Sequence, residues 1–304
     1  MRNFTFKRQL LFVMFMLLGC LSIQAADDGL ITKQITIKLD KAGTLPDKIG
    51  STKKKQITNL KIIGEINGTD WCFIREMAGC DYNCEKTGGK LSMLDLSDAK
   101  IVKGGLPYIK YNGGVYTSND KLGYAAFSDC SGLTSLTIPS SVTSIGEYAF
   151  YGCSGLTSLT IPSNVTSIGE SAFHGCSGLT SLTIPSSVTS IGWGAFCGCS
   201  GLTSIYVYTE KLPNMGSDVF DGCDAKKCTV YVPKGTYDDY WLSEFGYFEN
   251  IVEFEATGIN NVVTSNDAKE LSRYSVNGQR LSAPTKGLNI VKYSNGSVKK
   301  VAVQ

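Results

Sequence analysis

Apolar and polar positions follow a pattern that repeats every 23 residues across the middle of the chain. Three copies, 127–149, 150–172 and 173–195, are nearly identical, and a degraded copy and a fragment begin at Phe196 and Phe220. The spacing L-x-x-L-x-L places the apolar side chains of a short strand on one side and its hydroxyl side chains on the other. The apolar positions of the first copy are Leu133, Leu136, Ile138, Val142, Ile145, Ala149 and Phe150.

One such copy cannot bury enough apolar surface to offset the entropy lost when its residues become ordered. Successive copies must therefore stack, with their strands paired in parallel and each apolar layer covering the next. A period of this length with this leucine spacing predicts a β-rich α/β fold, a leucine-rich-repeat solenoid of 23-residue coils. The open ends of the stack need covers.

The segment 27–123 is predicted to be the N-terminal cap. Irregular copies of the strand spacing occur at 57–62 and 91–96, and an alternating strand at 34–39 is expected to close the end. Residues 71–77 are expected to form a helical turn, and Asn-Gly and Gly-Gly pairs mark turns between these elements.

The segment 124–254 is predicted to hold the solenoid and an aromatic C-terminal cap. Six aromatic residues follow the last strand, and they suit either a lid over the final apolar layer or a carbohydrate platform. These residues are Tyr237, Tyr240, Trp241, Phe245, Tyr247 and Phe248. Beyond them, 258–304 is predicted to be a small all-β tail, with hairpin turns at Asn277-Gly278 and Asn295-Gly296.

Residues 1–25 have the parts of a secretory signal peptide: basic residues, an apolar run at 10–18 and a small-residue cleavage site ending at Ala25. Processing at Cys20, with acylation as a lipid anchor, is the alternative. Either route exports the protein to the cell surface or the medium, with the periplasm as a further destination. The apolar run at 10–18 is too short to span a membrane comfortably, and no second candidate span exists downstream.

The net charge of +2 includes three basic residues of the leader, so removing 1–25 leaves −1. No basic patch remains that would favour nucleic acid as a partner.

Eleven cysteines in an exported chain raise the question of disulfides. Five recur with the repeat and are predicted to form a buried structural ladder of free thiols, because parallel Cβ vectors hold neighbouring sulfur atoms too far apart. These are Cys130, Cys153, Cys176, Cys199 and Cys223. A local disulfide between Cys80 and Cys84 in the N-terminal cap remains a possibility.

Catalytic chemistry is not expected. His174 is the only histidine, in a slot expected to be exposed, and no nucleophile or second base is fixed beside it by spacing. One histidine and no C-x-x-C pair also argue against a zinc site. The sequence therefore predicts a protein that is not an enzyme and that uses no metal or other cofactor.

The remaining candidate is a ligand surface on the exposed strand face. Hydroxyl side chains should align in two rows, either simply as polar residues that favour strands or as a flat surface for a peptide or glycan. Tyrosines border these rows, and Trp193 in a variable slot is a candidate contact. The candidate surface comprises Ser135, Thr137, Ser158, Thr160, Ser181, Thr183, Ser204, Tyr206, Tyr208, Trp193 and Tyr231.

The repeat CSGLTSLTIPSSVTSIGEYAF resembles the BspA-like leucine-rich repeats of bacterial surface proteins over 127–233. This resemblance implies a right-handed solenoid that displays a binding surface, with adhesion as the usual role. The ending from Arg273 to Val303 is similar to the sorting tails of type IX secretion cargo. The expected function is an exported protein-interaction and adhesion module for a host or cell-surface protein; a carbohydrate-binding surface protein is the alternative.

Overall fold

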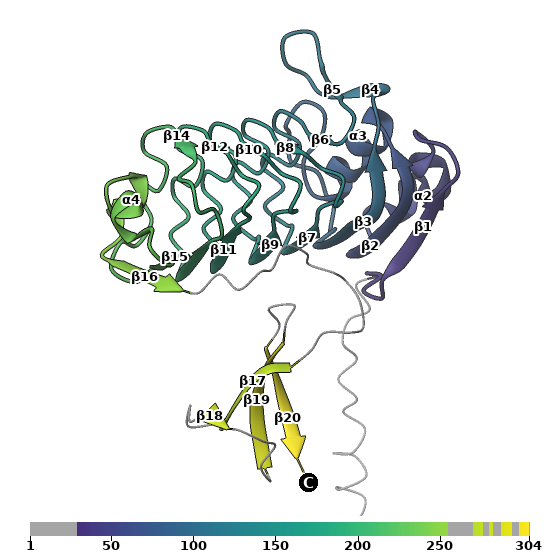
Figure 1. The fold of residues 1–304 in the computed structure, drawn as a ribbon. Helices are drawn as coiled ribbons and strands as arrows, with labels where there is room; N and C mark the ends of the chain where they lie inside the picture. The colour runs from purple at the N-terminus through teal and green to yellow at the C-terminus, as the bar shows by residue number, and fades with distance from the viewer. Residues whose placement is uncertain (1–28, 255–269, 276–279, 282–286, 294–297, 304) are drawn as a thin grey trace, which may run out of the picture.

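Residues 29–254 wind into successive coils, each of which contributes a strand to a long parallel sheet (Figure 1). The computed structural model describes residues 29–254, 270–275, 280–281, 287–293 and 298–303. The leader, Cys20 and the two Asn-Gly turns of the tail lie outside these ranges.

The main sheet consists of parallel strands in sequence order. Repeat strands pair at the repeat period, so that Ser135 lies opposite Ser158, and Ser181 lies opposite Ser204. The order β1-β2-β3-β7-β9 continues into β11-β13-β15-β16, because β9 and β11 lie side by side. The strands are β1 (Ile35–Leu39), β2 (Asn59–Ile66), β3 (Met93–Ile101), β7 (Ser135–Thr137), β9 (Ser158–Thr160), β11 (Ser181–Ile184), β13 (Ser204–Val207), β15 (Thr229–Pro233) and β16 (Asn250–Phe254). The parallel pairing predicted from the repeat is confirmed.

A second parallel sheet of two-residue strands lies across the core from the main sheet (Figure 1). Its order is β14-β12-β10-β8-β6. The strands are β6 (Lys121–Leu122), β8 (Ser144–Ile145), β10 (Ser167–Ile168), β12 (Ser190–Ile191) and β14 (Asn214–Met215). The repeat spacing predicts one strand per coil and does not reveal this sheet, because strands of two residues carry no alternating pattern.

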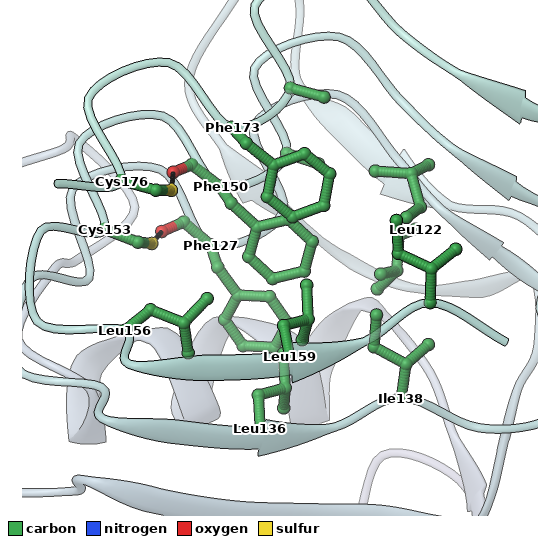
Figure 2. Packing of buried hydrophobic residues seen from close by; sticks show 14 of the residues in the cluster. Leu122, Phe127, Leu136, Ile138, Phe150, Cys153, Leu156, Leu159, Phe173 and Cys176 are labelled. Atoms are coloured by element: carbon green, nitrogen blue, oxygen red, sulfur yellow. Dashed lines mark hydrogen bonds between the residues drawn. The ribbon is translucent and has the colours of Figure 1, made fainter. Parts of the chain in front are cut away.

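Stacked phenylalanines connect the coils along one side of the core (Figure 2). Adjacent ring centroids are 4.9–5.8 Å apart and nearly parallel, and each ring is buried. The members of this phenylalanine ladder are Phe127, Phe150, Phe173, Phe196 and Phe220. Backbone hydrogen bonds accompany it, as the N–H of Phe127 donates to the carbonyl of Ala149 in the next coil at 2.7 Å.

The repeated cysteines are buried free thiols beside this ladder. The thiol of Cys153 donates to the carbonyl of Phe127 at 3.0 Å, and that of Cys176 donates to the carbonyl of Phe150 at 3.1 Å (Figure 2). Cys199 and Cys223 make the same contact with the carbonyls of Phe173 and Phe196, one and two coils further on. Each of these four thiols therefore donates to a carbonyl of the preceding coil instead of meeting another sulfur.

Alkaline pH is expected to destabilise the stack through these thiols. Burial raises the pKa of Cys176 from 9.0 to about 12, and a hydrogen bond with the backbone of Cys153 acts in the opposite direction. The thiol stays protonated in the folded chain while the unfolded chain ionises, so its contribution is complete below pH 9 and is lost between pH 9 and 12. Urea denaturation across this range should show a smaller loss of stability for Cys176→Ala than for the wild type. An identical pH dependence would contradict this assignment.

Helix α3 (Gly68–Met77) covers the first repeat. Its N-terminus is a capping box formed by Asn67 and Asp70. Trp71 packs on Phe127 with centroids 5.1 Å apart, and its indole N–H donates to the carbonyl of Ala126 at 2.9 Å. In later coils the equivalent carbonyl accepts a hydrogen bond from a backbone N–H of the preceding coil, as the carbonyl of Ala149 does from Phe127. At this end of the repeats, the indole of Trp71 takes the place of that backbone donor. Residues 71–77 thus form most of a helix rather than a single turn.

Helix α2 (Leu45–Lys53) and a hairpin complete this end of the stack. The helix was missed because Gly50 interrupts it with a φ of 79° and only Leu45 and Ile49 are buried apolar positions. The hairpin pairs β4 (Gly104–Ile109) with β5 (Val115–Thr117) around the predicted Gly-Gly turn.

The opposite end is covered by helix α4 (Tyr237–Trp241) and the 3₁₀-helix η1 (Glu244–Tyr247). Phe245 and Phe248 are buried against Phe220, with centroids 5.0 and 5.1 Å away, and so end the phenylalanine ladder. A carboxylate oxygen of Glu244 accepts a hydrogen bond from the N–H of Val219 at 3.2 Å.

The C-terminal tail forms an antiparallel sheet in the order β18-β17-β19-β20. Its strands are β17 (Glu270–Ser275), β18 (Arg280–Leu281), β19 (Gly287–Tyr293) and β20 (Val298–Val303). Within the described ranges, no helix has the length and apolarity needed to cross a membrane.

Candidate functional site

The outer face of the main sheet carries two rows of side chains that cross the strands. Leucine and isoleucine alternate inward, which leaves the serine and threonine positions facing out. Cross-strand partners fix the rows, since Thr137 lies opposite Thr160 and Thr183 lies opposite Tyr206. The structure brings together on this face Ser135, Thr137, Ser158, Thr160, Ser181, Thr183, Ser204, Tyr206 and Tyr231.

Toward the N-terminus, the row through Thr137 passes through charged residues before it reaches Thr36 of strand β1. Asp95 lies opposite both Thr137 and Lys61. The ammonium of Lys61 contacts the carboxylates of Asp95 and Asp98 at 3.1 and 2.7 Å, and hydrogen bonds to Asp98 and then Asp95 raise the pKa of Lys61. These residues were not predicted, although Lys61 and Asp95 occupy the outward position of the irregular strand spacing.

Toward the C-terminus, the same row passes through stacked tyrosines before it reaches Val252 of strand β16. Tyr206 and Tyr231 lie opposite one another, with ring centroids 4.6 Å apart and an interplanar angle of 7°. Burial, and then the neighbouring Tyr231, raise the pKa of Tyr206. Tyr208 follows strand β13, and its ring meets Phe254 edge-on at 5.3 Å. We call Tyr206, Tyr208 and Tyr231 the tyrosine cluster. The face therefore carries charged residues, hydroxyl rows and the tyrosine cluster in this order along the stack.

Trp193 does not belong to this surface. It follows strand β12 of the second sheet, on the other side of the core from the main sheet. Its indole N–H donates to a carboxylate oxygen of Asp218 at 2.9 Å, and 45% of the residue is exposed. The sequence-based surface therefore included one residue that the fold places elsewhere, because variability of a slot does not reveal its face.

A second aromatic group runs from the β4–β5 hairpin onto turns of the repeat region. Tyr111, Tyr124, Tyr148, Tyr151 and His174 contact one another in that order, with successive centroids 5.0, 5.6, 5.9 and 5.0 Å apart. Tyr151 and His174 occupy the same slot of successive repeats, but sequence reasoning missed the group because Tyr111, Tyr124 and Tyr148 lie outside that slot.

His174 stacks on Tyr151 and is half-buried rather than exposed as expected. No described hydrogen bond joins it to a serine or cysteine side chain, and within the described residues no three histidine, cysteine or acidic side chains could hold a metal ion.

The aromatic segment after the last repeat divides into inward and outward residues. Tyr240, Phe245 and Phe248 are fully buried and cover the final apolar layer. Tyr237 and Trp241 remain exposed, with parallel rings whose centroids are 6.1 Å apart. The segment therefore contains both a lid and an exposed ring pair.

A family model described as the BspA type leucine rich repeat region matches six copies between residues 120 and 239. No curated protein matches the chain.

Two solved structures resemble the chain. A leucine-rich repeat protein from Bacteroides ovatus ATCC 8483 has a TM-score of 0.37 and 22% identity over 73% of this chain and 66% of its own. A leucine rich cell surface protein from Faecalibacterium prausnitzii A2-165 has a TM-score of 0.32 and 21% identity over 68% of this chain and 53% of its own. The chain thus spans about two thirds or less of each of these proteins.

Proposed function

Because the chain carries six BspA-type leucine-rich repeats, we propose that it is a non-enzymatic protein-interaction module. In this proposal the coils form a right-handed solenoid whose main-sheet face binds a protein on a host or neighbouring cell. The segment 27–123 and the aromatic segment that ends at 254 close the two ends. Adhesion is the role that such a module would serve.

The stacked Tyr206–Tyr231 pair is the observation that carries this proposal. Both rings sit on adjacent strands of a rigid sheet and support each other, so little side-chain freedom is lost when a partner covers them. Tyrosine is enriched among residues that dominate binding energy in interfaces. The hydroxyl rows beside the pair offer hydrogen-bond donors and acceptors without a desolvated charge.

Tyr206→Ala is expected to weaken binding of an extracellular partner by about 30-fold, which corresponds to about 2 kcal/mol. The full chain would first be screened against immobilised matrix and cell-surface proteins, and Kd values would then be measured for the variant. Tyr116→Ala is the matched control, because Tyr116 is an exposed tyrosine on the hairpin strand β5. Equal affinities of Tyr206→Ala and wild type would remove the tyrosine cluster from the binding site.

Carbohydrate binding is the second candidate, and the exposed Tyr237–Trp241 ring pair favours it. Sugar rings pack on aromatic faces of this kind through their apolar C–H surfaces. A glycan array would separate the two candidates. Signal on glycans alone, lost in Trp241→Ala and kept in Tyr206→Ala, would replace the protein-binding proposal.

We also propose export, with residues 1–25 as the signal peptide or Cys20 as a lipid anchor, and 258–304 as a type IX sorting tail. Protease treatment of intact cells that express the chain with and without 258–304 tests the location. Loss of surface exposure on deletion supports the sorting role, and unchanged exposure argues against it.

A further inference from the structure

Arg75 is a buried cation without a carboxylate partner in the part of the chain that the structure describes. One guanidinium nitrogen donates to the carbonyls of Ala125 and Ala126 at 2.8 and 3.1 Å, and the Nε atom has no partner. A charge removed from water is costly unless an opposite charge or strong hydrogen bonds compensate it. The contacts of the remaining guanidinium nitrogen therefore decide how the charge of Arg75 is compensated.

That nitrogen, Nη2, faces two sulfur atoms. It lies 3.2 Å from the sulfur of Cys80 and 3.9 Å from the sulfur of Cys84. The two sulfur atoms can therefore be no further apart than these two distances combined. A guanidinium beside a thiol favours the thiolate, which is the nucleophile in disulfide exchange.

The loop between the two cysteines holds this arrangement. Cys80 bridges Lys86 in an antiparallel contact, and the carboxylate of Asp81 accepts hydrogen bonds from the N–H groups of Asn83 and Glu85. Cys84 adopts a φ of 64°, which is unusual for a residue with a side chain. Through this turn an exposed residue directs its sulfur back toward Arg75.

The two thiols differ in access. Cys80 is buried, and burial raises its pKa to about 11 although Arg75 acts in the opposite direction. Cys84 is exposed to solvent. An oxidant in solution can therefore reach Cys84 first, with Cys80 behind it as the resolving thiol.

We propose that Cys80 and Cys84 form a redox-active pair that closes to an intramolecular disulfide. The thiolate of Cys84 attacks one sulfur of a small disulfide such as oxidised glutathione, which releases one glutathione thiolate. Cys80 then loses its proton, and its sulfur attacks the sulfur of Cys84 and releases the second glutathione. Two electrons pass to the oxidant, and the two protein protons end on the released thiols.

The repeated cysteines are a built-in contrast. Cys153, Cys176 and Cys199 are buried, each donates to a backbone carbonyl, and burial raises the pKa of each of them. None of them has both solvent access and a cation beside its sulfur. We expect them to stay reduced under conditions that oxidise Cys80 and Cys84.

The test is mass spectrometry of the full chain after incubation with oxidised glutathione, alkylation and trypsin digestion. Cleavage after Arg75 and Lys86 gives the peptide 76–86, whose only cysteines are Cys80 and Cys84. The expected peptide is two hydrogen atoms lighter than the dithiol form and takes up no alkylating reagent. A peptide with two alkylated cysteines, or with a glutathione on each, overturns the proposal.

Three variants assign the roles. Cys84→Ser should leave Cys80 reduced, whereas Cys197→Ser, which changes a partly exposed thiol in the repeat region, should still give the lighter peptide. Arg75→Lys should slow closure several-fold, because a shorter ammonium side chain cannot hold both sulfur atoms. An unchanged rate in Arg75→Lys would remove the guanidinium from the mechanism.

Discussion

Replacing Gly178 by alanine is expected to cost about 3 kcal/mol or more of unfolding free energy, whereas the same change at Gly132 should cost little. A Cβ atom at Gly178 would lie 2.5 Å from the carbonyl oxygen of Ser154 in the preceding coil. The backbone of Ser154 cannot move away from this Cβ atom without separating the two coils. At Gly132, in the same slot of the first copy, the nearest atom would be the carbonyl oxygen of Ala78 at an ordinary 3.7 Å.

Urea denaturation followed by circular dichroism would measure both variants. The pair is well matched, because both glycines stand in the sequence CSGLTSLTIPSSVTSIG and neither has a positive φ. The residue change and the local sequence are therefore the same in the two variants, and only the approach of the neighbouring coil differs between them. Equal losses at the two positions would show that coil spacing is not what selects glycine.

Phe173→Ala is expected to lower the unfolding free energy by about 3–5 kcal/mol. Its ring is fully buried between Phe150 and Phe196, with centroids 4.9 and 5.2 Å away, so removal leaves a cavity shared by three coils. Because each coil contacts only its neighbours, the damage should also separate unfolding into two transitions.

The control is Thr160→Ala on the exposed face, which should change stability by less than about 0.5 kcal/mol. Denaturant curves recorded by circular dichroism would compare the two variants. A loss below about 1 kcal/mol for Phe173→Ala would mean that the ladder is not the main support between coils.

The sequence predicted the elements whose pattern is periodic. Strands such as Ser158–Thr160, with leucine in and hydroxyls out, follow directly from the spacing, as does the alignment of Thr137 with Thr160. The tyrosine cluster was predicted as a border of these rows, and the stacking of Tyr206 on Tyr231 follows from their equal register.

Contacts outside the regular spacing of the main strands could not be predicted. The second sheet escaped detection because strands such as Ser144–Ile145 are only two residues long. The placement of Trp193 and the stacking of Tyr151 on His174 depend on where each turn projects its side chains, which the period alone does not determine. The position of Arg75 beside Cys80 depends on how helix α3 docks, and no repeat constrains that docking.

Hydrogen bonds between coils recur at the repeat period, which affects how the number of repeats can change during evolution. Thr157 and Thr203 donate to the carbonyls 23 residues before them, Thr134 and Thr180, so each coil presents the next with the same set of donors and acceptors. Gain or loss of one whole unit by recombination would restore every backbone contact at the junction. The length of the rod can therefore drift in steps of about 4.8 Å without loss of folding. A change in repeat number would alter the distance between the charged pair Lys61–Asp95 and the tyrosine cluster while leaving both intact.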